Sequence, residues 1–176
     1  MNLFTLLFNR EKAMKYFLEW QKAVSPNTPD HLVMNFKQLK AWTATSVKND
    51  QRIINDCVEI LEKTTKPDTF FSRFGLLTDK VAHLSTLAEY ASEAGYKPKY
   101  LKRKCATLPL RYNYFIEMFL SRYYSETVQK AEILKTEKGR NNKYQKFYDS
   151  LQEYYSYMTE EHIDFIETKY RLHTNH

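Results

Sequence analysis

Hydrophobic residues return at helical intervals between Thr69 and Ala91. Their spacing alternates between three and four positions, which places them in one stripe roughly 100° wide on a helix. The stripe consists of Phe70, Phe74, Leu77, Val81, Leu84, Ala88 and Ala91. The polar residues Asp79 and Thr86 fall on the opposite side. This pattern predicts a central helix against which the other helices pack.

Similar periodicity predicts helices along most of the chain, and no stretch shows the alternation of a strand. The expected helical segments are residues 1–24, 29–63, 96–108, 110–134 and 143–158, and a last helix that Thr159 caps. The β-branched run at 43–47 leaves open whether residues 29–63 form one helix or two. We therefore expect an all-α fold, a single-domain antiparallel bundle of six or seven helices over residues 1–176.

Polar segments with Pro or Gly predict where the chain reverses. The expected turns lie at SPNTPD (25–30), at KTTKPD (63–68) and at AGYKP (94–98). The segment at 134–142 is polar and contains a glycine, so we expect an exposed basic loop there. Gly75 falls inside the central helix on its polar side, where it costs about 1 kcal/mol relative to alanine.

The cysteines and the apolar segments indicate the cellular compartment that we expect for the protein. Cys57 shares an apolar helical face with Ile54 and Leu61, so it is expected to be a buried, reduced thiol. Such a thiol fits a reducing cytoplasm. No apolar run approaches the roughly 20 residues of a membrane span. Residues 1–8 are apolar, and we expect them to dock loosely on the body of the fold rather than on a membrane surface or a partner.

Three segments of the chain resemble an uncharacterised family of small helical proteins from Gram-positive bacteria and their phages. They are MNLFTLLFNR, KPDTFFSRFGLL and LKTEKGRNNKYQKFYDSL, and together they cover about half of the chain in patches. The resemblance implies a helical fold and a bacterial or phage setting. It carries no catalytic residue to this chain.

The residues that could carry chemistry form no catalytic or metal-binding pattern. His162 is followed by Phe165 and Ile166 at the positions where a helical metal site needs its second ligand. With only three glycines, a glycine-rich phosphate loop is excluded, and no nucleophile–base motif occurs. We therefore predict no catalytic residue, no metal site and no cofactor, and expect that the protein is not an enzyme.

One cluster of charge is distinctive. No acidic residue lies between Glu93 and Glu117, and the six cations in this interval account for the whole formal net charge of +6. The candidate binding patch comprises Lys97, Lys99, Lys102, Arg103, Lys104 and Arg111 with Tyr96 and Tyr100. Two further tyrosines, Tyr112 and Tyr114, follow.

Three interpretations of the patch stay open at the level of sequence. Cations interleaved with aromatic rings are typical of nucleic-acid surfaces, where they contact phosphates and stack on bases. The same cations suit a protein partner with an acidic surface, which is the function we expect first. They could also form a solvated helix face with no partner. The sequence leaves open a homo-oligomer.

Overall fold

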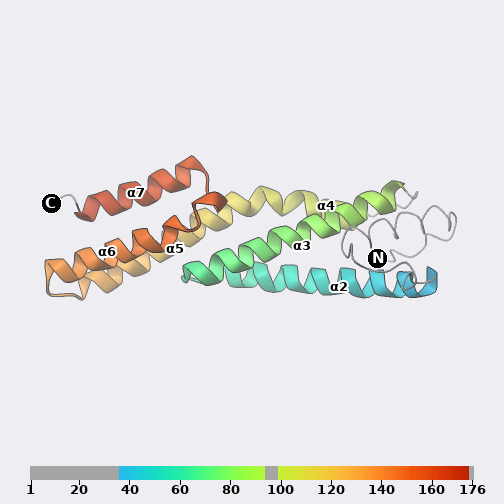
Figure 1. Cartoon of the computed structure of the whole chain (residues 1–176), viewed down its shortest axis with the longest axis horizontal. Helices are drawn as coiled ribbons and strands as arrows, with labels where there is room; N and C mark the ends of the chain where they lie inside the picture. Colours follow the sequence, from blue (N-terminus) through green and yellow to red (C-terminus); the bar gives the residue numbers. More distant parts are fainter. Residues whose placement is uncertain (1–35, 94–98, 175–176) are drawn as a thin grey trace. The chain divides into compact units, whose positions relative to one another are not determined.

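A computed structural model of the chain describes residues 36–93 and 99–174. Every regular element in these two ranges is a helix, and no strand occurs among them (Figure 1). The elements are α2 (Phe36–Leu61), α3 (Pro67–Glu93), α4 (Lys99–Thr107), η3 (Pro109–Arg111), α5 (Tyr112–Glu132), α6 (Glu137–Gln152), η4 (Tyr155–Tyr157) and α7 (Glu160–Thr174). The prediction of an all-α chain is confirmed for this part of the sequence. The expected N-terminal helix, the turn at 25–30 and the turn at 94–98 lie outside the described residues.

The helix α3 has the burial that the hydrophobic stripe predicts. Six of the seven stripe positions are buried, and the seventh, Ala91, has a side chain outside the described set. Pro67 occupies the first helical position, where its missing N–H costs nothing, and Asp68 in the first turn favours the positive end of the helix dipole. The predicted set of buried residues was incomplete, because Phe71 and Leu87 are also buried.

The helix α2 shows that the described part of the segment 29–63 forms one helix rather than two. It runs without a break from Phe36 to Leu61, through the β-branched residues at 43–47. Ile54, Cys57 and Leu61 are each no more than 1% exposed, which confirms the predicted apolar face and the buried thiol at Cys57. Packing of this face outweighs the low helix propensity of the β-branched run.

The contacts divide the chain into two units. The first unit contains the described residues of Met1–Asp56 and Leu77–Pro109, and the second contains Cys57–Leu76 and Leu110–His176. Within the first unit, Lys80 on α3 forms an ion pair with the buried Asp50 on α2, with Nζ and Oδ1 3.1 Å apart. The ion pair holds the two helices together at a point where the carboxylate is largely withdrawn from water. The single domain expected from chain length stays a prediction.

The second unit has an aromatic core that links α3, α5 and α6. The ring of Phe70 stacks on Phe119 at a centroid distance of 4.2 Å. Tyr123 continues the series, 5.8 Å from Phe119 and 5.2 Å from Phe147. Each ring buries a large apolar area, and the ring pairs add directional contacts beyond that burial. This part of the core explains why so many of the chain's aromatic residues follow Thr69.

The prediction of an exposed loop at 134–142 is wrong for most of these residues. The helix α6 begins at Glu137, so only residues 133–136 separate it from α5. Thr136 caps the new helix, because its Oγ1 accepts a hydrogen bond from the backbone N–H of Gly139 at 3.2 Å. Glu137 adds a favourable charge in the first turn. The expected helix at 143–158 therefore starts earlier, and it ends at Gln152, before η4.

Candidate functional site

The basic segment that the sequence singled out forms the short helix α4 (Lys99–Thr107). Leu101 is fully buried and Leu108, just after the helix, is 7% exposed. Cys105 is half-buried. The two leucines therefore mark the inward side of this segment, which belongs to the first unit.

Three cations occupy the opposite side of α4. Lys99, Lys102 and Arg103 are exposed, and none of them forms an ion pair with another residue of the described part of the chain. We refer to these three residues as the basic face of α4. Their charges are close in sequence and lie on the side of α4 away from the buried leucines.

Two other cations of the predicted patch are engaged within the protein. Lys104 is half-buried and its Nζ donates a hydrogen bond to Oδ1 of Asn55, 3.0 Å away. Arg111 belongs to the second unit, where its guanidinium pairs with Glu62 at 3.0 Å and lies 4.7 Å from the ring centroid of Phe115. The patch is therefore smaller than the sequence suggested.

The aromatic members of the patch are only partly described. Lys97, Tyr96 and the side chain of Tyr100 lie outside the described residues. Tyr112 is half-buried and meets Phe74 edge to face, with centroids 5.3 Å apart. A ring held in this way contributes to the core of the second unit rather than to base stacking.

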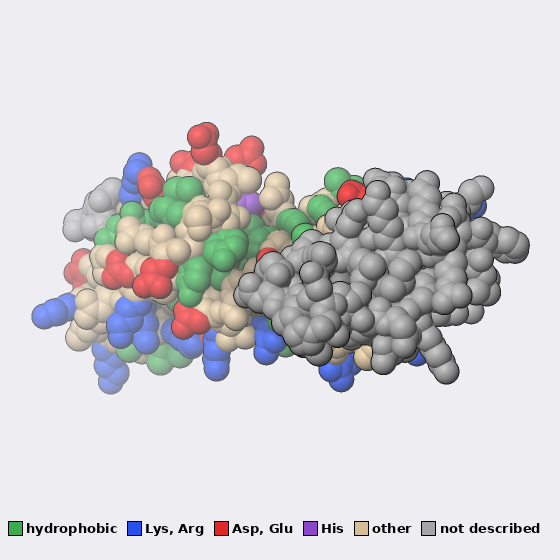
Figure 2. Space-filling model, turned by 45° about the vertical axis from the view of Figure 1, so that its right-hand side comes forward, with side chains coloured by type: hydrophobic (Ala, Val, Ile, Leu, Met, Phe, Trp, Pro, Cys, Tyr) green, Lys and Arg blue, Asp and Glu red, His purple; other side chains and the backbone are tan. Residues whose placement is uncertain are grey.

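An exposed apolar stripe lies on the second unit. Leu110 in η3 and Tyr114 and Met118 in α5 recur every fourth residue and are 82%, 50% and 39% exposed. Figure 2 shows hydrophobic side chains reaching the surface among acidic and basic ones over the described helices. Tyr and Met are enriched at protein interfaces relative to the rest of protein surfaces. This exposed apolar stripe was not predicted from the sequence.

The two cysteines have no disulfide. Burial raises the pKa of the Cys105 thiol, and the neighbouring charge of Lys104 opposes that shift only in part. The nucleophilic form of cysteine is the thiolate, which a raised pKa disfavours. Cys105 therefore lacks the electrostatic setting of a reactive thiol.

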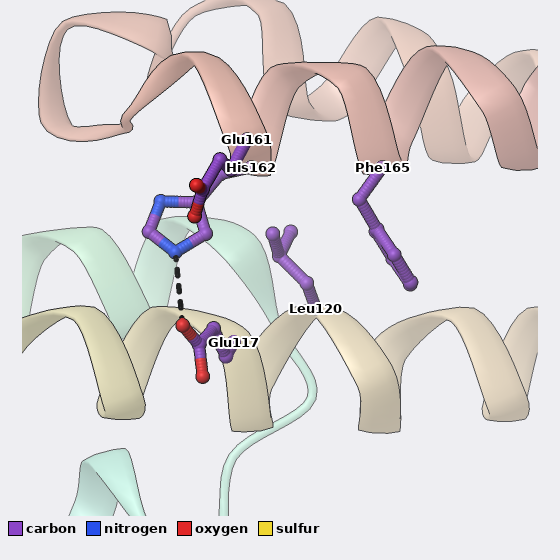
Figure 3. Close-up of a pocket in the computed structure, with 5 residues that line it drawn as sticks. All are labelled: Glu117, Leu120, Glu161, His162 and Phe165. Carbon is purple, nitrogen blue, oxygen red and sulfur yellow. Dashed lines mark ion pairs between the residues drawn. The ribbon is translucent and has the colours of Figure 1, made fainter.

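A cavity of about 210 Å³ lies between α5 and α7 in the second unit (Figure 3). Glu117 and Leu120 line it from α5, and Glu161, His162 and Phe165 line it from α7. Figure 3 shows Glu117 directed toward the imidazole of His162, with Leu120 and Phe165 extending from the facing helices. No sequence pattern indicates this cavity, because its two sides come from helices far apart in the chain.

His162 is 4% exposed and its hydrogen bonds fix its tautomer. Nδ1 accepts a hydrogen bond from the backbone N–H of Thr159 at 3.1 Å, so the proton of the neutral ring is on Nε2. Nε2 lies 3.9 Å from Oε1 of Glu117, beyond hydrogen-bond distance. Burial lowers the pKa of His162, against the smaller opposing effects of Glu117 and Glu161, and so favours the neutral ring.

His173 has partners of its own on the second unit. Its ring stacks on Tyr144 with centroids 3.8 Å apart, and its Nε2 lies 2.8 Å from the hydroxyl of Tyr124. His176 lies outside the described residues. Within the described ranges, no three His, Cys, Asp or Glu side chains are close enough together to hold a metal ion.

None of the helices in residues 36–93 and 99–174 is both long enough and apolar enough to cross a membrane. Comparison of the chain with protein-family models, with curated proteins and with solved structures finds no match.

Proposed function

We propose that this chain is a non-enzymatic protein-binding or adaptor protein that acts in the cytoplasm and is of bacterial or phage origin. In this proposal the basic face of α4 binds an acidic surface on a protein partner. The whole chain is taken to form one antiparallel bundle of six or seven helices, with α3 near its centre. The bacterial or phage origin rests on the resemblance of three sequence segments alone.

The exposure of the basic face is the observation that carries the proposal. Lys99, Lys102 and Arg103 are close together on one short helix and have no acidic partner in the described ranges. Like charges at helical spacing repel each other by a few tenths of a kcal/mol, so the arrangement does not favour α4 by itself. A partner with negative charge would remove this repulsion on binding.

The contacts that the other residues of the patch make within the protein favour a protein partner over nucleic acid. Arg111 pairs with Glu62, Lys104 donates a hydrogen bond to Asn55, and Tyr112 packs on Phe74. Three exposed cations offer few phosphate contacts compared with the six to ten that give strong salt-dependent DNA binding. The exposed stripe of Leu110, Tyr114 and Met118 adds apolar area of the kind found in protein interfaces.

The proposal assigns no reaction to this chain because neither cysteine thiol has the setting of a nucleophile. Cys57 is buried and the pKa of Cys105 is raised, which supports structural rather than nucleophilic roles. A reduced, buried Cys57 also supports the cytoplasmic setting.

Capture of partners from the native host, with the full chain as bait, tests the proposal. The eluate is analysed by mass spectrometry with and without nuclease treatment. We expect an acidic protein that resists nuclease and whose affinity changes modestly with salt. Loss of the captured material after nuclease, or an affinity that falls with a slope near −0.9 per phosphate on a double logarithmic salt plot, would assign the face to nucleic acid instead.

A further inference from the structure

The cavity between α5 and α7 has the size of a single side chain. Its volume of about 210 Å³ exceeds the roughly 150 Å³ of an engineered cavity that holds benzene. It falls below the roughly 300–1,000 Å³ of pockets that take drug-sized ligands. Nucleotides and large cofactors are therefore too big, while an aliphatic chain of four or so carbons fits.

The charges around the cavity select for a cation. Glu117 and Glu161 contribute two carboxylates, and no lysine or arginine among the described residues lines the space. The side chain of His162 is only 5% exposed, and its lowered pKa keeps the ring neutral, so it does not offset the carboxylates. Its Nε2 lies 3.9 Å from Oε1 of Glu117, too far for a hydrogen bond, so this carboxylate remains available to a cation.

The walls suit an apolar chain that ends in a positive charge. Leu120 and Phe165 extend from the facing helices and give methylene groups a surface to pack on (Figure 3). Nζ of Lys169, which is not among the residues that line the cavity, lies 5.5 Å from the centroid of the Phe165 ring. That distance is within the range of cation–π attraction.

We propose that this cavity is a binding site for a primary alkylammonium group. Lysine side chains and free aliphatic amines both carry this group. The methylene chain packs between Leu120 and Phe165, and the ammonium group donates hydrogen bonds to the carboxylates of Glu117 and Glu161. The site belongs to the second unit and does not depend on the basic face of α4.

The test uses the full chain and n-butylammonium chloride, which reproduces the chain and charge of a lysine side chain. The ring resonances of His162 report occupancy, and a His162→Gln spectrum assigns them. With five non-hydrogen atoms in the probe, we expect a dissociation constant on the order of millimolar. Sodium chloride at equal ionic strength and 1-butanol, which lacks the charge, are the matched probes and should shift the resonances much less.

Paired variants test the carboxylates. The double variant Glu117→Gln, Glu161→Gln should bind n-butylammonium about five- to tenfold more weakly, since exposed charge pairs contribute modestly. Glu160→Gln is the control, because Glu160 is exposed in the same first turn of α7 but does not line the cavity. Circular dichroism checks that each variant keeps its helices.

A blocked peptide with one lysine among glycines distinguishes a lysine side chain from a free amine as the source of the alkylammonium group. Tighter binding of the peptide than of n-butylammonium would assign the site to a polypeptide, and the reverse order would assign it to a free amine. Equal responses to 1-butanol and n-butylammonium would overturn the proposal, as would a double variant that binds as well as the unchanged chain. A His162 resonance that responds only to ionic strength would do the same.

Discussion

The guanidinium of Arg122 on α5 donates a hydrogen bond to the backbone carbonyl of Leu61, 2.7 Å away, at the last residue of α2. A second bond of 2.6 Å reaches the carbonyl of Glu62. Carbonyl groups at the end of a helix have no partner within the helix, and a positive charge there also favours the negative end of the dipole. The last turn of α2 contains no basic residue of its own. Arg122 therefore supplies from another helix the cap that the sequence of α2 lacks.

Arg122→Met is expected to lower the free energy of unfolding by about 2–3 kcal/mol, because two charge-assisted hydrogen bonds are lost and two carbonyls are left without them. Chemical denaturation measures the change. Arg171→Met is the control, since Arg171 forms only an exposed pair with Glu167 on the same helix and should cost less than about 1 kcal/mol. Equal effects of the two variants would contradict the capping role.

Two glycines within helices should respond differently to replacement by alanine. A Cβ at Gly75 would lie 3.6 Å from the hydroxyl oxygen of Tyr157, an ordinary contact. Gly75→Ala should therefore stabilise the protein by about 0.5–1 kcal/mol, the usual gain for this change within a helix. The position faces Tyr157 rather than the polar side that the sequence suggested.

A Cβ at Gly139 would lie 2.8 Å from Oγ1 of Thr136, the atom that caps α6. Gly139→Ala should displace this cap, whose loss costs about 1 kcal/mol, and so cancel the gain in helix propensity. Thermal denaturation of both variants measures the contrast. A stabilisation at Gly139 as large as that at Gly75 would show that the cap tolerates the methyl group.

The pH dependence of stability should contain a contribution from His162. Burial places its folded-state pKa below the ordinary value of 6.5, so the unfolded chain takes up the proton first as the pH falls. The contribution to stability is complete above pH 6.5 and is lost as the pH falls from there toward the folded-state pKa. Protonation of Nδ1 would also remove the hydrogen bond from the N–H of Thr159.

His162→Gln provides the comparison, because a glutamine at this position can accept the N–H of Thr159 and does not titrate. Urea denaturation of both proteins between pH 8 and pH 5 measures the effect. We expect the variant to lose less stability than the unchanged chain over that interval. Parallel curves would mean that His162 does not contribute to the pH dependence.

Phe74→Ala should be among the most destabilising single changes in the second unit. Phe74 is 4% exposed and its ring lies 5.3 Å from Tyr112 and 5.9 Å from Phe70. Removing such a ring costs about 3–5 kcal/mol, and Leu84→Ala in the first unit should cost about 2–5 kcal/mol. Asp79→Ala, on the exposed side of the same helix, should change stability by no more than about 0.5 kcal/mol.

Periodicity within one helix was enough to predict much of the fold. The buried face of α3 and the apolar face of α2 follow from residues three and four apart, which meet on one side of any helix. Phe71 was missed because its burial depends on another helix. It stacks on Tyr154 at 4.3 Å, and no local pattern indicates that contact. The start of α6 was missed for a local reason, since a polar segment with a glycine was given more weight than the cap at Thr136.

The same distinction applies to the sites. The exposed side of α4 could be predicted, because Leu101 and Leu108 determine which side faces inward. The contacts of Arg111 with Glu62 and of Lys104 with Asn55 could not be predicted, since each pair joins residues 49 positions apart in the chain. The cavity at His162 depends in the same way on Glu117 and Leu120 of α5, which no spacing rule connects to α7.

Charge reversal on the basic face tests the central claim most directly. Lys99→Glu, Lys102→Glu and Arg103→Glu are combined in one variant, and Lys135→Glu, Lys138→Glu and Lys146→Glu, also exposed, give a control with the same change in net charge. Both should keep their stability within about 1 kcal/mol, because exposed side chains seldom contribute more. The measurement is the dissociation constant for the captured partner protein by calorimetry. The proposal predicts at least about tenfold weaker binding for the α4 variant and little change for the control, since like charges brought together at an interface are costly. Unchanged binding by a folded α4 variant would contradict it.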